Sequence, residues 1–109
     1  MDLTLKHTEQ IVMLAIMRKH PNAYGVSIFE ELSSRAGIEP AMATIYNTLD
    51  KLEQKGFVKS RKGETTPERG GRAKMYFEMT GLGHKALVAS LNAIDRMRTD
   101  INKPVRVRA

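Results

Sequence analysis

Residues 41–80 decide the fold, and they run AMATIYNTLDKLEQKG followed by FVKSRKGETTPERGGRAKMYFEMT. In the first part, Ile45, Leu49 and Leu52 recur at i, i+4 and i+7, the spacing of one apolar stripe along a helix. The opposite side is polar and carries Thr44, Tyr46, Asn47, Thr48, Lys51 and Lys55. The pattern predicts a helix that buries one face in a core and offers hydrogen-bonding groups and cations on the other.

Proline and glycine mark the ends of this helix and the elements after it. Pro40 stands where a helix can begin, because a first-turn residue needs no partner for its N–H, and Gly56 suits the left-handed residue that stops a helix. Two strand-like runs follow at 57–61 and 74–79, joined by a polar connector at 62–72 that holds three glycines and a proline. A helix followed by a hairpin with a basic tip predicts a winged helix, mainly α with a small β-hairpin.

Two helices precede this stretch. The first is predicted at 7–19, with Thr4 or Thr8 as its cap, and the second at 24–35. Gly37 is expected to end the second helix. The link that follows is short, so the second helix and the next one form a helix-turn-helix.

One long helix follows the hairpin. Thr80 is predicted to cap it, and it runs from Gly81 to about Ile101. Roughly 20 residues at 1.5 Å each span ~30 Å, more than a small core needs, so this helix is predicted to mediate dimerisation. The chain thus divides into a winged helix-turn-helix domain at 1–80, a C-terminal dimerisation helix at 81–102 and a basic tail at 103–109.

Composition limits the class of protein. A chain of 109 residues, 41% hydrophobic and 28% charged, fits one soluble globular domain. The absence of cysteine excludes a disulfide framework, a thiolate metal site and a cysteine nucleophile. No run approaches the ~20 apolar residues of a membrane span, and the amino terminus has no signal-peptide pattern, so a cytoplasmic location is expected.

The net charge of +6 is concentrated in the middle of the chain. Residues 1–50 carry a net charge of −2, whereas 51–74 hold 8 basic and 3 acidic residues, and 75–109 hold 6 and 3. Cationic density therefore peaks at the end of the helix after Pro40 and over the hairpin, which predicts a polyanionic partner such as duplex DNA. The alternative is that the basic loops only keep the protein soluble.

A set of positions spread over roughly 7–91 forms a recognisable pattern: Glu9, Leu14, Tyr24-Gly25, Ile28, Leu32, Ala43-Thr44-Ile45-Tyr46, Leu49, Leu52-Glu53, Gly56-Phe57-Val58, Gly70-Gly71-Arg72, Tyr76, Met79-Thr80, Gly83 and Leu87. This pattern resembles the PadR family of transcriptional repressors. One departure is Asn47, where many members have proline. The resemblance implies a homodimeric repressor, released by a small aromatic effector or by a change in protein partner. The chain has no Trp, so the Trp-based drug pocket of some members has no counterpart.

The predicted DNA contacts fall into two sets. Side chains near the start of the 41–55 helix can reach base edges in the major groove, and this base-contacting set is Ala43, Thr44, Tyr46, Asn47 and Thr48. The phosphate-contacting set is Lys51, Lys59, Arg61, Lys62, Arg69, Arg72 and Lys74. Two alternatives stand beside these assignments. In the first alternative, the ring of Tyr46 packs between the helix and the wing. In the second, the run from Arg69 to Arg72 is an RNA-binding element rather than a wing tip.

The predicted dimer interface is apolar. Leu87, Leu91, Ile94 and Ile101 share one face of the last helix, and the 7–19 helix adds a broad apolar band that includes Ile11 and Leu14. An apolar stripe of this kind is unfavourable when it is exposed to water. When two copies pair about a two-fold axis, the same stripe forms a self-complementary interface. The alternative for the 7–19 helix is that it is the central helix of a small core.

Catalytic and metal-binding patterns are missing from the sequence. His7, His20 and His84 are far apart and belong to no metal-binding motif, and the adjacent Glu30 and Glu31 point in different directions on a helix. Neither enzymatic activity nor a metal or cofactor is therefore expected.

The sequence predicts a DNA-binding transcriptional regulator that acts as a homodimer on an inverted-repeat operator. The rival is a protein-interaction winged-helix module without specific DNA binding. Binding to RNA or to single strands is disfavoured, because aromatic residues make up only 6% of the chain and offer few stacking platforms.

Overall fold

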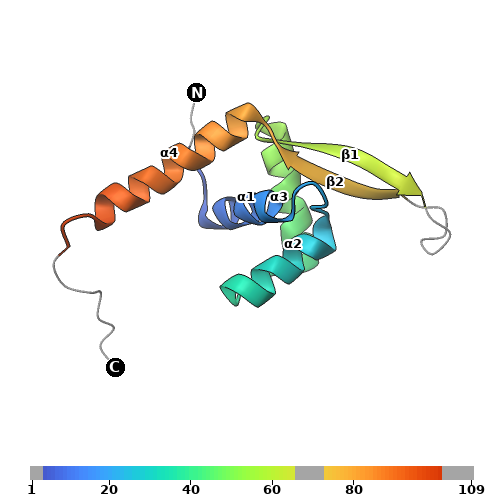
Figure 1. Ribbon diagram of the computed structural model, residues 1–109, viewed down its shortest axis with the longest axis horizontal. Coiled ribbons are helices and arrows are strands. Elements are labelled where there is room, and N and C mark those ends of the chain that lie inside the picture. The colour runs from blue at the N-terminus through green and yellow to red at the C-terminus, as the bar shows by residue number, and fades with distance from the viewer. Residues whose placement is uncertain (1–3, 66–72, 102–109) are drawn as a thin grey trace.

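The helices and the hairpin follow the expected order. The computed structural model describes residues 4–65 and 73–101. Within them the elements are α1 (His7–Lys19), α2 (Gly25–Glu31), the π-helical turn η1 (Leu32–Ala36), α3 (Met42–Gln54), β1 (Val58–Thr65), β2 (Ala73–Met79) and α4 (Gly81–Arg98) (Figure 1). The prediction of a mainly helical protein with a small antiparallel hairpin is confirmed.

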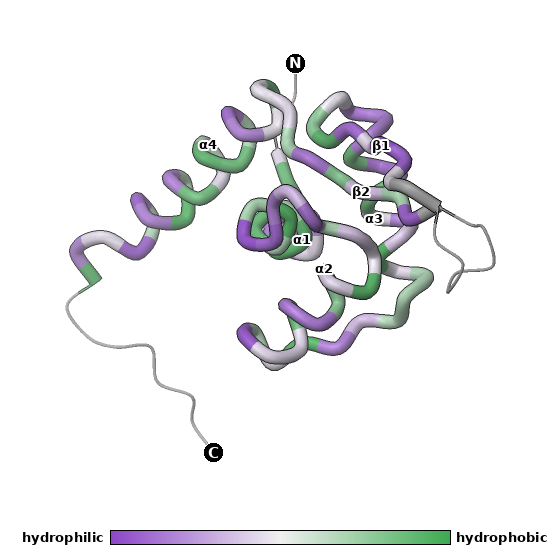
Figure 2. The backbone as a smooth tube through the Cα atoms, turned by 45° about the vertical axis from the view of Figure 1, so that its right-hand side comes forward, coloured by the Kyte–Doolittle hydropathy of each residue, from purple (hydrophilic) through white to green (hydrophobic). Residues whose placement is uncertain are grey.

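The core is centred on α1. Figure 2 looks almost along this helix, which lies between α4 on one side and α3 with the hairpin on the other. Its buried side chains pack with those of the other segments in one apolar core: Val12, Met13 and Ile16 come from α1 itself, and Ile28, Leu32, Ile45, Leu49, Leu52, Phe57, Phe77 and Leu87 come from the segments packed against it. Each large side chain of this kind stabilises the fold by about 1.5–3 kcal/mol when it is fully buried. The broad apolar band of α1 is thus explained first by its central place in the core.

The helix α1 has the predicted bounds but a different cap. Its N-cap residue is Lys6, whose N–H donates to Glu9 Oε1 at 2.8 Å. The prediction that Thr4 or Thr8 caps this helix is wrong, because a glutamate in the first turn reaches back to the N-cap N–H instead.

The link between α2 and α3 is short, as predicted, but α3 starts later. The turn η1 closes the helix, and Gly37 follows at φ 68°, the left-handed conformation expected of a glycine there. Pro40 lies outside α3, which starts at Met42 with Ala41 as its N-cap. The helix predicted at 41–55 thus starts one residue late, and Pro40 is not in its first turn, because the backbone is still extended at Ala41, where ψ is 146°.

The hairpin is antiparallel, and its first strand is longer than predicted. Val58 pairs with Met79 at the root. The strand β1 continues to Thr65, beyond its predicted end, because pairing with β2 extends into the polar connector. Gly56 at φ 78° makes the turn from α3 towards β1, as expected. The remainder of the connector, 66–72, lies outside the described residues.

The helix α4 is anchored at its start and projects from the body at its end. Thr80 Oγ1 accepts a hydrogen bond from the Gly83 N–H at 3.0 Å, which confirms the predicted cap. A Cβ at Gly83 would collide with the Phe57 carbonyl group, so only glycine lets α4 lie this close to the root of the hairpin. The helix ends at Arg98, short of the predicted end at Ile101, and its last turns extend away from the other helices (Figure 1).

Candidate nucleic-acid interface

The start of α3 presents an exposed face. Ala43, Thr44 and Asn47 are exposed in the first two turns of the helix. The opposite side fixes this orientation, because Ile45 and Leu49 are wholly buried. The Asn47 amide has the donor and acceptor needed to pair with the edge of adenine, and the Thr44 hydroxyl can serve as either. These side chains lie where a recognition helix carries its base contacts.

Thr48 does not belong to this face. Its side chain is only 8% exposed, and its Oγ1 donates to the Thr44 carbonyl oxygen at 2.7 Å. Residue 48 lies three positions after Ile45 and four before Leu52, which places it on the buried stripe. The prediction that Thr48 contacts bases is wrong, because its hydroxyl is satisfied within its own helix.

Tyr46 packs against the start of α2. The residue is 45% exposed, and its hydroxyl lies directly over Gly25, where a Cβ would overlap the ring. The alternative for Tyr46 places its ring between the helix and the wing. The ring instead contacts Gly25, the first residue of α2. Gly25 is required here by this close approach.

The hairpin cations of the phosphate-contacting set differ in how firmly they are held. Arg61 is held on two sides, with Nε 3.3 Å from Glu78 Oε1 and Nη2 donating to the Pro21 carbonyl oxygen at 3.0 Å. Lys59 is only loosely paired, 3.8 Å from the Glu78 carboxylate, and is largely exposed. The Lys62 side chain is exposed and makes no ion pair or hydrogen bond with the described part of the chain.

The other cations of that set occupy three different settings. Lys74 Nζ lies 4.1 Å from the centre of the Tyr24 ring, a cation–π contact within the protein. Lys51 is exposed on α3. Arg69 and Arg72 lie outside the described residues. Among the described cations, the exposed lysines are thus better placed for phosphates than the partnered Lys74.

An ion pair between a buried glutamate and a partly exposed lysine, which the sequence analysis did not predict, holds the end of α3 against α1. Glu9 is almost fully buried, and its Oε2 accepts a hydrogen bond from Lys55 Nζ at 2.7 Å. Burial raises the pKa of Glu9, but the hydrogen bonds from Lys55 and from the Lys6 N–H outweigh it, so this pKa lies below its ordinary value. No local pattern signals this pair, because its members are 46 positions apart.

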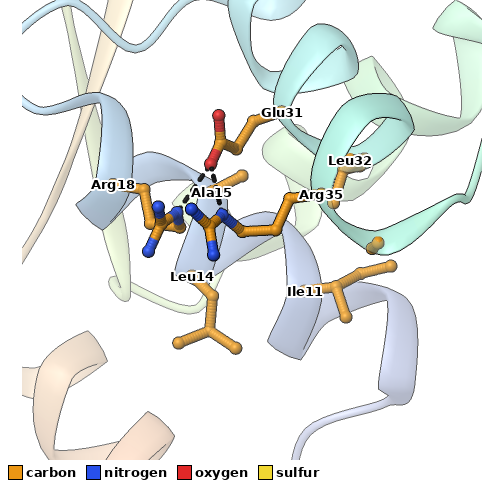
Figure 3. Close-up of a pocket in the computed structure, with 8 residues that line it drawn as sticks. Ile11, Leu14, Ala15, Arg18, Glu31, Leu32 and Arg35 are labelled. Atoms are coloured by element: carbon orange, nitrogen blue, oxygen red, sulfur yellow. Dashed lines mark hydrogen bonds and ion pairs between the residues drawn. The ribbon is translucent and has the colours of Figure 1, made fainter.

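A pocket of about 300 Å³ lies between α1 and the segment formed by α2 and η1 (Figure 3). Apolar side chains form most of its lining: Ile11, Leu14, Ala15, Leu32 and Ala36. At its rim Arg18 and Arg35 converge on Glu31, with Nε to Oε1 distances of 2.6 and 3.3 Å. The hydrogen bond from Arg18 holds the pKa of Glu31 below its ordinary value. Two residues of the predicted dimer interface, Ile11 and Leu14, therefore line a surface groove.

The other residues predicted for the dimer interface occupy three environments along α4. Leu87 is 1% exposed within the core, so its assignment to an interface is wrong, because it has no surface to offer. Leu91 is half-buried and packs against the same core. Ile94 and Met97 are 43% and 79% exposed, and Ile101 is exposed beyond the end of the helix. Met97, which the predicted interface omitted, is thus the most exposed large apolar side chain of α4.

The described part of the chain holds no cluster of three or more His, Cys, Asp or Glu side chains that could bind a metal ion. In residues 4–65 and 73–101, no helix is both long enough and apolar enough to cross a bilayer.

A helical body, a helix-turn-helix with an exposed polar start to its second helix, and an antiparallel hairpin beside it define the winged-helix class. The model of the transcriptional regulator PadR-like family matches residues 13–89. The chain belongs to this family, as the sequence resemblance predicted.

Solved structures share the fold. A transcriptional regulator from Clostridium thermocellum is 22% identical, with a TM-score of 0.74 over 92% of this chain and 94% of that one. A PadR family regulator from Clostridium difficile is 21% identical, with a TM-score of 0.68 over 86% and 94%. Bacillus subtilis PadR, solved in complex with operator DNA, is 17% identical, with a TM-score of 0.65 over 95% and 55%. At these identities the likeness shows the fold alone. A sequence comparison with curated proteins gives no match.

Proposed function

We propose that this PadR-like regulator binds duplex DNA sequence-specifically and represses transcription as a homodimer. The observation that carries the proposal is the exposed polar start of α3 beside a cationic hairpin, with Thr44 and Asn47 on the helix and Lys59 and Lys62 on the strand. Donors and acceptors at the start of a recognition helix contact base edges, and cations beside it contact phosphates. The complex of Bacillus subtilis PadR with operator DNA supports this use of the fold.

Repression follows from occupancy of the DNA. Two recognition helices enter successive major grooves, and the wings hold the flanking phosphates. The phosphate contacts set the affinity and its salt dependence, because each one releases condensed counterions. The base contacts of α3 set which sequence is preferred. A dimer bound in this way blocks access to the promoter by its size alone.

The exposed end of α4 supports the homodimer. The helix has 18 residues and spans about 27 Å at 1.5 Å per residue. Its first turns pack on the core, but Ile94 and Met97 lie exposed beyond it. A second copy would cover them, and the groove lined by Ile11 and Leu14 is a further apolar surface for the same interface (Figure 3). Two-fold symmetry requires an inverted-repeat operator, with half-site centres ~10 bp apart or a multiple of that.

Capture of genomic fragments tests the proposed function. The protein is mixed with fragmented genomic DNA, and the bound fragments are sequenced. Affinity is then measured for the recovered duplex and for a random duplex over a range of salt. The recovered site should bind at least ~10³-fold more tightly, as specific sites do, and both affinities should fall steeply with salt. Equal affinity for the two duplexes contradicts specific binding, and no binding to either favours the protein-interaction module.

A further inference from the structure

The segment 21–25 leads into α2, and its carbonyl oxygens accept hydrogen bonds from both strands of the hairpin. The Ala23 carbonyl oxygen accepts a hydrogen bond from the Phe77 N–H of β2 at 2.8 Å. The Pro21 carbonyl oxygen accepts one from Arg61 Nη2 of β1 at 3.0 Å. The hairpin is therefore attached to the helical body at a second place besides its root.

Four side chains continue this attachment, and we name them the tyrosine cluster: Tyr24, Arg61, Lys74 and Tyr76. The rings of Tyr24 and Tyr76 meet edge to face, with centres 5.9 Å apart and planes at 81°. The Lys74 ammonium lies 4.1 Å from the Tyr24 ring centre, and the Arg61 guanidinium lies 4.8 Å from that of Tyr76. A Cβ at Gly63 would collide with the Tyr76 ring, so a glycine on β1 makes room for it.

The other end of the segment is fixed to the recognition helix. Gly25 supports the Tyr46 ring of α3 at close contact. The Tyr24 N–H donates to Ser27 Oγ at 2.9 Å, and Ser27 Oγ donates in turn to the Asn22 carbonyl oxygen at 3.1 Å. These bonds tie the segment to the first turn of α2. Residues 21–25 therefore form a short bridge between α3 and the hairpin.

A two-stranded hairpin needs such support to keep one orientation. An isolated pair of strands is marginally stable and twists readily. Val58 and Met79 form the first pair at the root, and Arg61 and Tyr76 form a pair three positions further out, about 10 Å along the strand. Any change of angle at the root displaces this outer pair, and the displacement grows with distance along the strands. Tyr24 contacts the hairpin at that outer pair, through the Tyr76 ring, where it restrains the angle better than the root alone.

We infer that residues 21–25, through the tyrosine cluster, hold the wing at the angle to α3 that the duplex requires. Tyr24 and Tyr76 are then positioning residues for DNA binding, and Arg61 and Lys74 act through the cluster rather than on phosphates. The link to DNA rests on the proposed function. The effect on the wing angle does not, and it can be measured without DNA.

A distance measurement between α3 and the wing tests the wing angle directly. The chain has no cysteine, so introduced cysteines are the only sites that a thiol-specific spin label can modify. One cysteine replaces Asp50 of α3 and the other replaces Lys62 of β1, both of which are exposed. Tyr24→Leu should broaden and shift the distance distribution between the labels. Tyr24→Phe should leave it unchanged, because the ring is kept and the Tyr24 hydroxyl makes no hydrogen bond within the described ranges.

A matched variant controls for general loss of stability. Phe29 lies on α2, the helix that Tyr24 precedes as N-cap, and is half-buried against the core, where it lines a surface pocket with Lys19 and Ser33. Phe29→Leu therefore removes an aromatic ring from α2 outside the tyrosine cluster. It should leave the distance distribution as in the parent. A Tyr24→Leu distribution that matches the parent overturns the inference. So does an equal change in Phe29→Leu, because the effect would then be one of packing in general.

Binding measurements then test the link to DNA. Lys62→Ala should flatten the salt slope of duplex binding by about one unit in the parent, as the loss of one phosphate contact does. In the Tyr24→Leu background it should change the slope little, because the wing no longer reaches its phosphate. An equal change in both backgrounds contradicts the role of the cluster in DNA binding. A parent that binds no duplex overturns the proposed function instead, and the distances still decide the wing angle.

Discussion

Asn47 and Thr48 are neighbours in the sequence, but α3 turns the first outward and the second inward. Asn47 is exposed, whereas the Thr48 hydroxyl donates to the Thr44 carbonyl oxygen at 2.7 Å. Both side chains are polar and of similar size, so composition alone does not separate them. The pair therefore offers a matched test of base contact at adjacent positions of one helix.

Asn47→Ala should cost about 1–3 kcal/mol of binding free energy on the preferred duplex and little on random DNA, because a bidentate contact discriminates between bases. Thr48→Val, the matched control, should leave both affinities unchanged. It should lower the free energy of unfolding by no more than ~0.5–1.5 kcal/mol, the net value of one hydrogen bond. Titration of both variants with both duplexes checks this. Equal losses on the two duplexes for Asn47→Ala would assign Asn47 to the DNA backbone instead.

The Glu9–Lys55 pair predicts a dependence of stability on pH. The pKa of Glu9 is depressed in the folded protein, because hydrogen bonds to Lys55 and to the Lys6 N–H outweigh burial. A depressed carboxyl pKa stabilises the fold at pH values above the ordinary pKa, and this contribution is lost as the pH falls through the folded value. The pair therefore stabilises the protein at neutral pH and not in acid.

Lys55→Met removes the ammonium and keeps most of the side-chain length. At pH 7 it should lower the free energy of unfolding by about 1–3 kcal/mol, because a buried carboxylate loses its partner. The difference from the parent should shrink as the pH falls below the ordinary pKa of Glu9, since a protonated carboxyl needs no cation. Urea unfolding over that pH range measures it. Lys51→Met, at an exposed lysine of the same helix, should show no such dependence, and a constant Lys55→Met penalty would rule out the pair as its cause.

At the scale of elements, the sequence predicts best what depends on neighbouring residues. The bounds of α1 follow from periodicity, and the ends at Gly37 and Gly56 follow from the need for a left-handed backbone. Contacts between distant segments leave no local pattern. Lys74, for example, is a wing cation in the sequence, but its ammonium lies on the ring of Tyr24, 50 positions earlier.

The wing is the element expected to set the affinity for duplex DNA and its dependence on salt. Arg69→Ala and Arg72→Ala should each weaken binding to all duplexes alike and flatten the salt slope by about one unit, because each would remove one of the proposed phosphate contacts. Lys85→Ala, which removes one cation from an exposed site on α4, is the matched control and should leave the slope unchanged. Affinity measured at several salt concentrations gives the slopes. Wing variants that bind as the parent does would show that the tip makes no phosphate contact.

At the scale of the whole molecule, the proposed DNA-binding surface and the proposed dimer interface lie far apart. The hairpin and the free end of α4 lie at opposite ends of the long axis, with the core between them (Figure 1). Basic residues concentrate in 51–74, whereas exposed Ile94 and Met97 lie on α4. Such a separation suits a dimer in which α4 joins two copies and leaves both wings accessible. Leu91, half-buried against its own core, is a poor probe of that interface.

Changing Ile94 and Met97 together to lysine should therefore give a folded monomer, because two charges on the exposed apolar face of α4 oppose its pairing about a two-fold axis. The monomer should keep weak, salt-sensitive DNA binding and lose most of its preference for the full inverted repeat, since one half-site then binds alone. Changing Ala89 and Asn92 together to lysine adds the same charge to the opposite, exposed face of α4 and should leave the dimer intact. Sedimentation of the parent and of both double variants decides between these states. If the parent stays monomeric at tens of micromolar, both the dimer and the inverted-repeat operator are wrong.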